Sequence, residues 1–285
     1  MINKVILVNK EKNYTSRDIV NIISKKLNTK KVGHLGTLDP LATGLLIIGI
    51  GALTKIGNFN LFDDKKYKAE VLIGTSTDTY DITGKVLETK ENINITQNKI
   101  EETLKSFIKT YNQQVPIYSA VKLHGKKLYE YARENKQVSL PKKEVTIYDI
   151  NGIKTYEKEH KKYFSFTCHV SKGTYIRSLI NDISKQLEVP LCMSNLERVA
   201  QGPFNIEEAC TLEDIKQDRY KLLDIREIFN LEEMTPPKEL EKIITNGGMI
   251  PKLSNNYILF TKDQQDLFLY GPYKDKMKPY LNFKN

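Results

Sequence analysis

The 285-residue sequence contains no tryptophan and only three cysteines, Cys168, Cys192 and Cys210. The cysteines are widely spaced and no C-x-x-C pair occurs, which argues against a zinc ribbon and against a thioredoxin-like redox site. Long apolar runs are also missing, because the longest stretch, LLIIGIGAL, is too short to span a bilayer. The N-terminal MINKVILVNK lacks the apolar core of a signal peptide. These absences predict a cytoplasmic protein with buried structural thiols and with neither a metal site nor a membrane span.

A nucleotide-binding glycine motif is missing as well. In GIGALT, Thr54 stands where the dinucleotide-binding pattern requires its third glycine, and no G-x-x-x-x-G-K-[ST] loop occurs. The glycine-rich stretch from Gly33 to Gly51 is therefore not expected to hold a nucleotide phosphate.

Positive charge is in excess, since 44 Lys and Arg face 35 Asp and Glu and give a net charge of +9. Such an excess indicates a polyanionic partner when the charges cluster. They do so between Lys122 and Lys143, where seven Lys or Arg stand against only Glu130 and Glu134. Tyrosines are interleaved with the cations, which is typical of a surface that grips a nucleic-acid backbone and stacks on bases. These tyrosines are Tyr118, Tyr129 and Tyr131.

Hydrophobic periodicity predicts both strands and helices. Strands are expected at residues 5–10, 66–75 and 163–171, and amphipathic helices at 15–27, 96–108 and 175–187. The elements follow no regular βαβα rhythm, which favours an α+β fold with a mixed, mostly antiparallel sheet flanked by helices.

A change of composition near residue 234 separates a small C-terminal segment from the rest of the chain. A short helix, a glycine turn and strand-like NYILF and DLFLYGPY follow the paired prolines. We therefore expect a large domain at 1–233 and a small β-rich domain at 234–285.

Asp39 is the least expected residue of the glycine-rich stretch, because it interrupts an increasingly apolar run. The simplest interpretation is structural, since Asp-Pro is a turn-favouring pair and glycines lie on both sides. The alternative is a carboxylate held rigidly for chemistry, and spacing alone does not decide between the two.

Five segments together resemble the TruB family of tRNA pseudouridine synthases. GHLGTLDPLATGLL resembles the family signature G-H-x-G-x-L-D-P-x-A-x-G-x-L, and four further segments follow in the family's order. They are KKYKAEVLIGTSTDTYDITG, PIYSAVKLHGKKLYEYAR, SKGTYIRSLINDI and NLERVAQGPF. The resemblance spans roughly residues 5 to 215.

The resemblance implies a stand-alone enzyme that converts uridine 55 in the T-loop of tRNA to pseudouridine without a cofactor or metal. It implies a thumb-like RNA-binding insertion at about residues 110–143 and a short PUA-like RNA-binding domain at the C-terminus. A monomer that contacts the T-stem loop, and no membrane, is expected.

The resemblance also assigns roles to individual residues. Asp39 is the expected nucleophile, which can attack either C1′ of the sugar or C6 of the base. Arg177 is expected to keep that carboxylate charged. The flipped-out nucleotide is expected to contact Tyr67, Tyr175 and Leu196, while His34 fills the space that it leaves in the RNA. Further RNA contacts are expected at Lys10, Lys122, Lys126, Lys127, Arg133 and Arg198.

The sequence departs from the family pattern at a few positions. Glu11 and Asn13 stand where the family usually has proline and glycine, and Glu197 stands where a second basic residue is common. Two other functions remain open, a guide-RNA-dependent relative and an RNA-binding or RNA-folding protein without catalysis.

Overall fold

The structure, a computed structural model, describes residues 2–284 and contains two compact units. The first unit comprises the described residues up to Pro40, Gly44–Phe62 and the described residues from Asn205 on. The second comprises Leu41–Thr43 and Asp63–Phe204. Over residues 2–284, no helix has the length and apolar character needed to cross a membrane.

The first unit is organised around the apolar strand β3 (Thr43–Ile50). It pairs antiparallel with β1 (Val5–Lys10) and with β2 (Val32–His34), and its residues 45–48 are fully buried. Burial on both faces explains why this strand has a continuous apolar sequence instead of an alternating one. The apolar run that follows Asp39 is thus the core of its unit.

Helix α1 (Ser16–Lys26) packs its predicted apolar residues inward and begins as the sequence predicts. Thr15 is the N-cap, and its hydroxyl accepts a hydrogen bond from the Asp18 N–H. The first unit also contains several short helices: η1 (Gly51–Asn58), η2 (Asn60–Phe62), η3 (Ile206–Glu208), α5 (Leu212–Lys216) and α6 (Ile225–Ile228).

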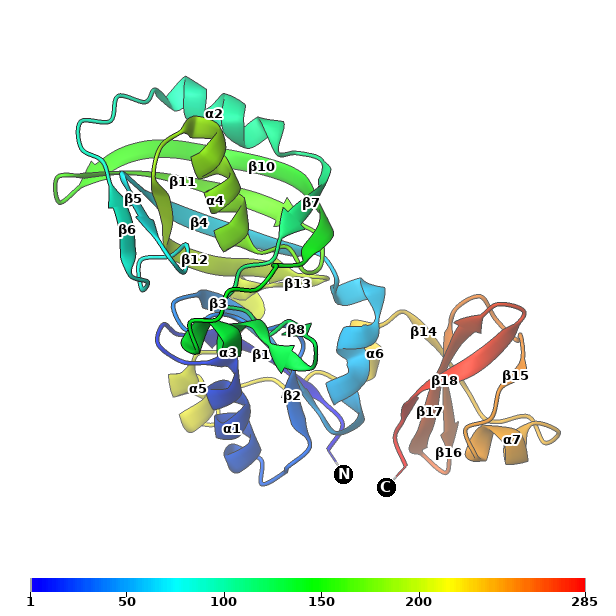
Figure 1. Cartoon of the computed structure of the whole chain (residues 1–285). Coiled ribbons are helices and arrows are strands. Elements are labelled where there is room, and N and C mark those ends of the chain that lie inside the picture. Colours follow the sequence, from blue (N-terminus) through cyan, green and yellow to red (C-terminus); the bar gives the residue numbers. More distant parts are fainter. Residues whose placement is uncertain (1, 285) are drawn as a thin grey trace. The chain divides into compact units, whose positions relative to one another are not determined.

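The C-terminal part of the chain is a small sheet, as predicted, and is coloured orange to red in Figure 1. Five strands follow the order β14-β16-β17-β18-β15, with β14 and β16 parallel and the other pairs antiparallel. Their bounds, with helix α7, are β14 (Leu231–Met234), α7 (Glu241–Thr245), β15 (Ile250–Pro251), β16 (Tyr257–Lys262), β17 (Gln265–Tyr273) and β18 (Lys276–Asn282). The expectation of a β-rich, PUA-like unit is confirmed, whereas the domain limits at 234 and at 110–143 stay predictions.

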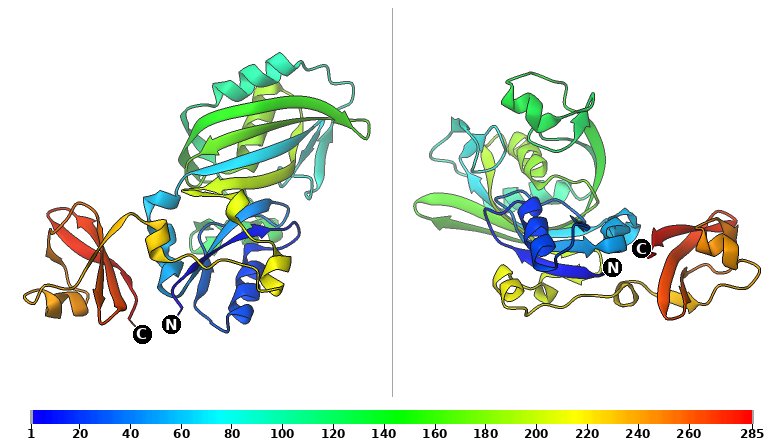
Figure 2. Two further views of the ribbon diagram at one scale, coloured as in Figure 1. Left: turned by 180° about the vertical axis from the view of Figure 1, so that it is seen from behind. Right: turned by 90° about the horizontal axis from the view of Figure 1, so that it is seen from below.

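The second unit is built on one antiparallel sheet with the order β12-β4-β11-β10-β7. Helices α4 and α2 lie on one face of it, in front of the strands in Figure 1 and behind them in the left view of Figure 2. The bounds are β4 (Lys65–Ile73), α2 (Gln97–Ser106), β7 (Thr110–Gln114), β10 (Lys142–Lys158), β11 (Lys161–Val170), α4 (Ile176–Leu187) and β12 (Leu191–Gln201), with β13 (Phe204–Asn205) paired to β12.

Two short hairpins complete this unit. One is formed by β5 (Thr75–Thr77) and β6 (Val86–Thr89), and the other by β8 (Lys122–Leu123) and β9 (Lys126–Lys127), which leads into α3 (Leu128–Arg133). His124 and Gly125 both have positive φ angles, 50° and 83°, as a tight two-residue hairpin turn requires.

The alternation predicted for β11 is confirmed, because Phe164, Phe166, Cys168 and Val170 are all buried. Strand β10, by contrast, was not predicted from the sequence. Most of its residues are exposed, and its pairing with β11 shifts between Asn151 and Lys154, where Gly152 has a φ of 62°. A bulge of this kind breaks the two-residue period on which a sequence prediction depends.

Candidate active site

The loop that carries Asp39 is fixed on both sides of the carboxylate. Ser16, at the start of α1, accepts a hydrogen bond from the Leu38 N–H at 2.8 Å and donates one to the Leu38 carbonyl at 3.2 Å. On the other side, the Asn13 N–H donates to the Pro40 carbonyl at 2.8 Å. Asp39 itself is half-buried. The backbone that presents its carboxylate therefore has little freedom.

Lys10 stabilises the Asp39 loop indirectly, because it orders the turn at residues 11–14 that contacts this loop. Its side chain is fully buried, and its Nζ donates to the carbonyls of Glu11 at 3.0 Å and Tyr14 at 2.7 Å. Asn13, in the same turn, has a φ of 71°. Asparagine tolerates this left-handed conformation better than most residues, so it can replace the glycine of the family pattern.

The RNA contact expected for Lys10 stays a prediction. In the structure its ammonium group is buried and binds two backbone carbonyls. Lys10 orders the turn whose Asn13 N–H holds the Pro40 carbonyl. His34, the last residue of β2, lies opposite Ile48 of β3 and is half-buried.

The chain passes into the second unit directly after Asp39 and Pro40. Leu41–Thr43 belong to that unit, and the Thr43 hydroxyl donates to the Leu196 carbonyl at 3.4 Å. Leu196 lies opposite Ala69 in the pairing of β12 with β4. Asp39 is thus two residues from a segment bonded to β12, the strand that carries Leu196.

Tyr67 lies on β4 of the second unit, between the neighbouring strands β11 and β12. It lies opposite Cys168 of β11 and opposite Arg198 of β12, and its side chain is buried. Arg198 is fully buried and places a cation beside Tyr67, while the RNA contact expected for it stays a prediction.

Lys65 lies on the same face of β4 as Tyr67, because side chains two residues apart on a strand share a face. Its Nζ donates to the Asp63 carbonyl at 2.7 Å. Burial, together with the nearby charge of Arg198, lowers the pKa of Lys65 to about 8. Two cations, Lys65 and Arg198, thus lie near Tyr67 on the sheet.

Tyr175 and Arg177 lie at the start of α4. Tyr175 is the N-cap of the helix, and its N–H donates to the Gln113 Oε1 at 2.8 Å. Arg177 is only 5% exposed, and it donates from Nη1 to the Thr79 carbonyl at 3.1 Å and from Nη2 to the Tyr118 carbonyl at 3.0 Å. The sequence alone would have made Arg177 an exposed helix residue.

Asp81 is a partner of Arg177 that the sequence analysis missed. Its Oδ2 lies 3.9 Å from the Arg177 Nε, and its Oδ1 accepts hydrogen bonds from the Thr83 N–H at 2.9 Å and the Thr83 hydroxyl at 2.6 Å. The available signal was the segment TDTYDITG, in which a second aspartate is surrounded by threonines that can bind it locally.

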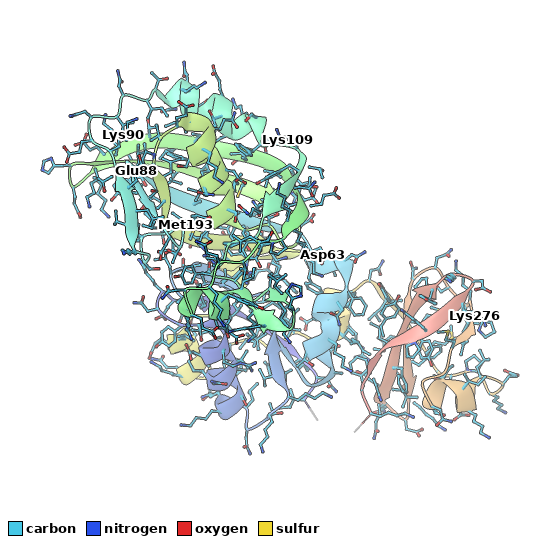
Figure 3. The ribbon with its side chains drawn as sticks, viewed as in Figure 1. Asp63, Glu88, Lys90, Lys109, Met193 and Lys276 are labelled. Carbon is cyan, nitrogen blue, oxygen red and sulfur yellow. The ribbon has the colours of Figure 1, made fainter. Side chains whose placement is uncertain are left out.

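Strand β12 holds the Asp81 loop in place through Met193, which is labelled in Figure 3. The Met193 N–H donates to the Tyr80 carbonyl at 3.0 Å, and its carbonyl accepts from the Ile82 N–H at 2.9 Å. These bonds fix the backbone on both sides of Asp81, so its carboxylate meets Arg177 in one geometry.

The cations predicted to bind RNA lie on the β8–β9 hairpin and α3, interleaved with tyrosine rings. The Lys127 ammonium lies 5.4 Å from the centre of the Tyr129 ring, and the Arg133 guanidinium lies 5.3 Å from it on α3. Lys126 pairs with Glu134 and lies 5.0 Å from the Tyr131 ring, while Lys122 is exposed. The predicted mixture of cationic and aromatic groups is present on this surface.

Two of the three cysteines are buried thiols. Burial raises the pKa of the Cys168 and Cys192 thiols to about 12, so both stay protonated at neutral pH. Within residues 2–284, no three His, Cys, Asp or Glu side chains are grouped so that they could hold a metal ion.

Sequence comparison relates the chain to curated proteins over nearly its whole length. Residues 24–176 match the family described as TruB family pseudouridylate synthase (N terminal domain). The chain is 39% identical over 274 residues to the tRNA pseudouridine synthase B of Caldanaerobacter subterraneus subsp. tengcongensis, covering 94% of each protein. It is 41% identical over 271 residues to the protein of that name from Bacillus pumilus, covering 93% of this chain and 85% of that one.

Structure comparison supports the predicted fold class. A chain in the crystal structure of a Cbf5-Nop10-Gar1 complex is similar with a TM-score of 0.66 and 22% identity, over 99% of this chain and 84% of that chain. At this identity the similarity shows the fold alone.

Replacing Ser16 by alanine tests the support of the Asp39 loop. The change leaves the buried N–H and carbonyl of Leu38 without their side-chain partner, and we expect the free energy of unfolding to fall by about 1–3 kcal/mol. Urea denaturation measures the loss. Ser24→Ala, on the same helix, removes a single bond to the Thr29 carbonyl at a half-buried site and should cost less. Wild-type stability of Ser16→Ala would contradict the assigned role.

The lowered pKa of Lys65 predicts a measurable titration. In NMR spectra of protein labelled with [13C]lysine, one side-chain signal should titrate near pH 8 and be absent from Lys65→Met. The folded protein then loses this proton before the unfolded chain does, so wild type should gain stability over Lys65→Met as the pH rises from about 8 to about 10.5. A Lys65 signal that titrates at the ordinary 10.5 would be inconsistent with its burial beside Arg198.

Proposed function

The chain belongs to the TruB family of pseudouridylate synthases, and on this basis we propose that it converts uridine 55 in the T-loop of tRNA to pseudouridine. It acts as a stand-alone monomer in the cytoplasm, without a guide RNA and without a cofactor. The tRNA substrate is supported by relatives about 40% identical over most of the chain, which are named tRNA pseudouridine synthase B.

The observation that carries the proposal is the support of Asp39. Its neighbours Leu38 and Pro40 are bonded to Ser16 and Asn13, so the carboxylate is presented from a fixed backbone. A nucleophile that is positioned before the substrate binds saves the entropy of bringing two groups together.

The reaction conserves the atoms of the nucleotide. The bond between N1 of the base and C1′ of the sugar breaks, the base rotates, and a bond between C5 and C1′ forms. The hydrogen on C5 leaves as a proton and N1 gains one. Asp39 attacks either C1′ or C6 in this sequence and leaves again at the end, so the enzyme is unchanged.

Arg177 keeps the Asp39 carboxylate ionised in this proposal. A carboxylate away from water is protonated unless a cation or several donors stabilise it. The guanidinium of Arg177 is fixed by the Thr79 and Tyr118 carbonyls and by Asp81, so it does not have to be ordered when the substrate arrives.

The flipped-out uridine is held by aromatic and apolar side chains. Tyr67 stacks on the base and is a candidate to move the proton from C5, beside the cations Lys65 and Arg198. Tyr175 and Leu196 form further walls of the pocket, and His34 fills the space that the nucleotide leaves. Stacking on these rings offsets part of the unstacking cost of a few kcal/mol.

The thumb insertion (residues 110–143) grips the RNA backbone in this proposal. Lys122, Lys126, Lys127 and Arg133 lie on its hairpin and helix, and their charges release counterions from the phosphates that they bind. The adjacent tyrosine rings offer stacking surfaces for unpaired bases.

Replacing Asp39 by asparagine removes the nucleophile while keeping the size of the side chain. We expect the release of tritium from [5-3H]uridine in a T-arm hairpin to fall at least about 1,000-fold, with the RNA dissociation constant changed by less than about threefold. Asp263→Asn is the matched control, because its φ of 50° suits asparagine equally well.

Normal turnover by Asp39→Asn would contradict the assignment. A wild-type protein that works only with an added guide RNA would support the guide-dependent alternative, and tRNA binding or refolding without any release of tritium would support the non-catalytic one.

Replacing Lys122 and Lys127 together by glutamine tests the thumb contacts. If each ammonium neutralises one phosphate, the slope of log affinity against log salt should become less steep by about 1.5. Lys99 and Lys105, which are exposed on α2, supply a control pair with the same change of charge. Equal slopes for the two double variants would show that this hairpin does not contact the backbone.

A further inference from the structure

The first strand of the thumb insertion, β7, is bonded to the start of α4 (Figure 1). The side chain of Gln113 accepts the Tyr175 N–H at 2.8 Å, and the carbonyl of Gln114 accepts the Ser178 hydroxyl at 2.8 Å. The thumb therefore contacts α4 at the turn that carries Tyr175 and Arg177, in addition to presenting the cations at its tip.

Both ends of the Gln113 amide are hydrogen-bonded, which fixes its orientation. Its side chain is 1% exposed, and its Nε2 donates to the Tyr111 hydroxyl at 2.8 Å while Oε1 receives the Tyr175 N–H. The Tyr111 hydroxyl in turn donates a hydrogen bond to the Asp182 Oδ2 on α4 at 3.4 Å. An amide with the opposite orientation would place its NH₂ group against the Tyr175 N–H, which is also a donor.

Gln113 fixes the backbone at the position that determines where Tyr175 points. Tyr175 is the N-cap, and no hydrogen bond from its own side chain caps α4. The helix holds the Tyr175 carbonyl, which accepts the Leu179 N–H at 3.0 Å, but the N–H of an N-cap residue lies outside the helical hydrogen-bond pattern. The bond to Gln113 holds that N–H.

Lys143 of the thumb and Thr146 of β10 contact the segment just before this turn. Gly173 has a φ of 85°, and the side chain of Lys143 crosses its Cα so closely that a Cβ there would lie 1.9 Å from the lysine Nζ. The Ser171 hydroxyl accepts the Thr146 N–H of β10 at 2.8 Å. Gln113 is the member of this set whose side chain reaches Tyr175 directly.

We propose that Gln113 is a positioning residue for the isomerisation, because its amide fixes the Tyr175 backbone and thereby the orientation of the Tyr175 ring on the flipped-out uridine. This inference rests on the proposed function. It assigns the thumb a role in the chemical step that is separate from the affinity supplied by its lysines and Arg133.

Neighbouring glutamines provide a matched pair for the test. Gln113→Met keeps the length of the side chain but removes both hydrogen bonds, whereas Gln114→Met leaves intact the backbone carbonyl through which Gln114 reaches Ser178. In single-turnover assays on the T-arm hairpin we expect the rate to fall about 10- to 100-fold for Gln113→Met and less than about twofold for Gln114→Met. RNA affinity should change less than about threefold in both.

A double-mutant cycle separates positioning from general destabilisation. If Gln113 acts through Tyr175, then Gln113→Met should slow Tyr175→Ala by less than about twofold, although it slows wild type much more. Equal slowing in the two backgrounds would overturn the inference.

The outcomes distinguish the two levels of the proposal. If Gln113→Met does not fold, Gln113→Asn runs the same cycle, because it keeps an amide that is too short to reach Tyr175. A wild-type protein without activity on the hairpin, or full activity of Tyr175→Ala, would contradict the proposed function. An active wild type with a fully active Gln113→Met would contradict only the role of Gln113.

Discussion

Burial of the Arg177 guanidinium is the constraint on which the second unit depends. A permanent cation that is 5% exposed must be surrounded by acceptors, because an unpaired buried charge costs several kcal/mol. The structure supplies Thr79 and Tyr118 carbonyls and the Asp81 carboxylate. These acceptors come from the β5–β6 loop and from the thumb, so the cation joins both segments to α4.

The first unit also contains buried polar side chains that bind backbone groups. Lys10 is fully buried and is satisfied by the carbonyls of Glu11 and Tyr14, and Ser16 satisfies both polar groups of Leu38. In both units a buried polar side chain orders irregular backbone that carries a predicted site residue. Regular hydrogen bonding does not do this alone, because Asp39 lies in a loop and α4 engages only the carbonyl of Tyr175, which accepts the Leu179 N–H at 3.0 Å.

The sequence predicts the regular elements well and the buried polar contacts poorly. Periodicity correctly indicates β11 and α4, because each has one apolar face that repeats at a fixed interval. The family resemblance assigned RNA contacts to Lys10 and Arg198, whereas their burial depends on strands distant in sequence and has no local sequence signal.

Asp81 and Gln113 escaped sequence analysis for a related reason. Asp81 contacts Arg177 and Gln113 contacts Tyr175, and both partners lie far along the chain at the start of α4. The local spacing of residues does not indicate such contacts. The motif resemblance located the residues expected to touch the substrate, but it does not identify the side chains that hold them. Only the folded chain brings β7 and the Asp81 loop to the start of α4.

The position of the thumb therefore matters beyond its charge. Its base contributes the Tyr118 carbonyl to the charged Arg177, a bond worth about 1.5–3 kcal/mol, and the Gln113 amide to the neutral Tyr175 N–H, a bond worth about 0.5–1.5 kcal/mol. A displacement of the thumb that broke these bonds would leave Arg177 with fewer acceptors and Tyr175 without its tether. RNA that holds the thumb in the observed position would thus also stabilise the turn from which both side chains extend.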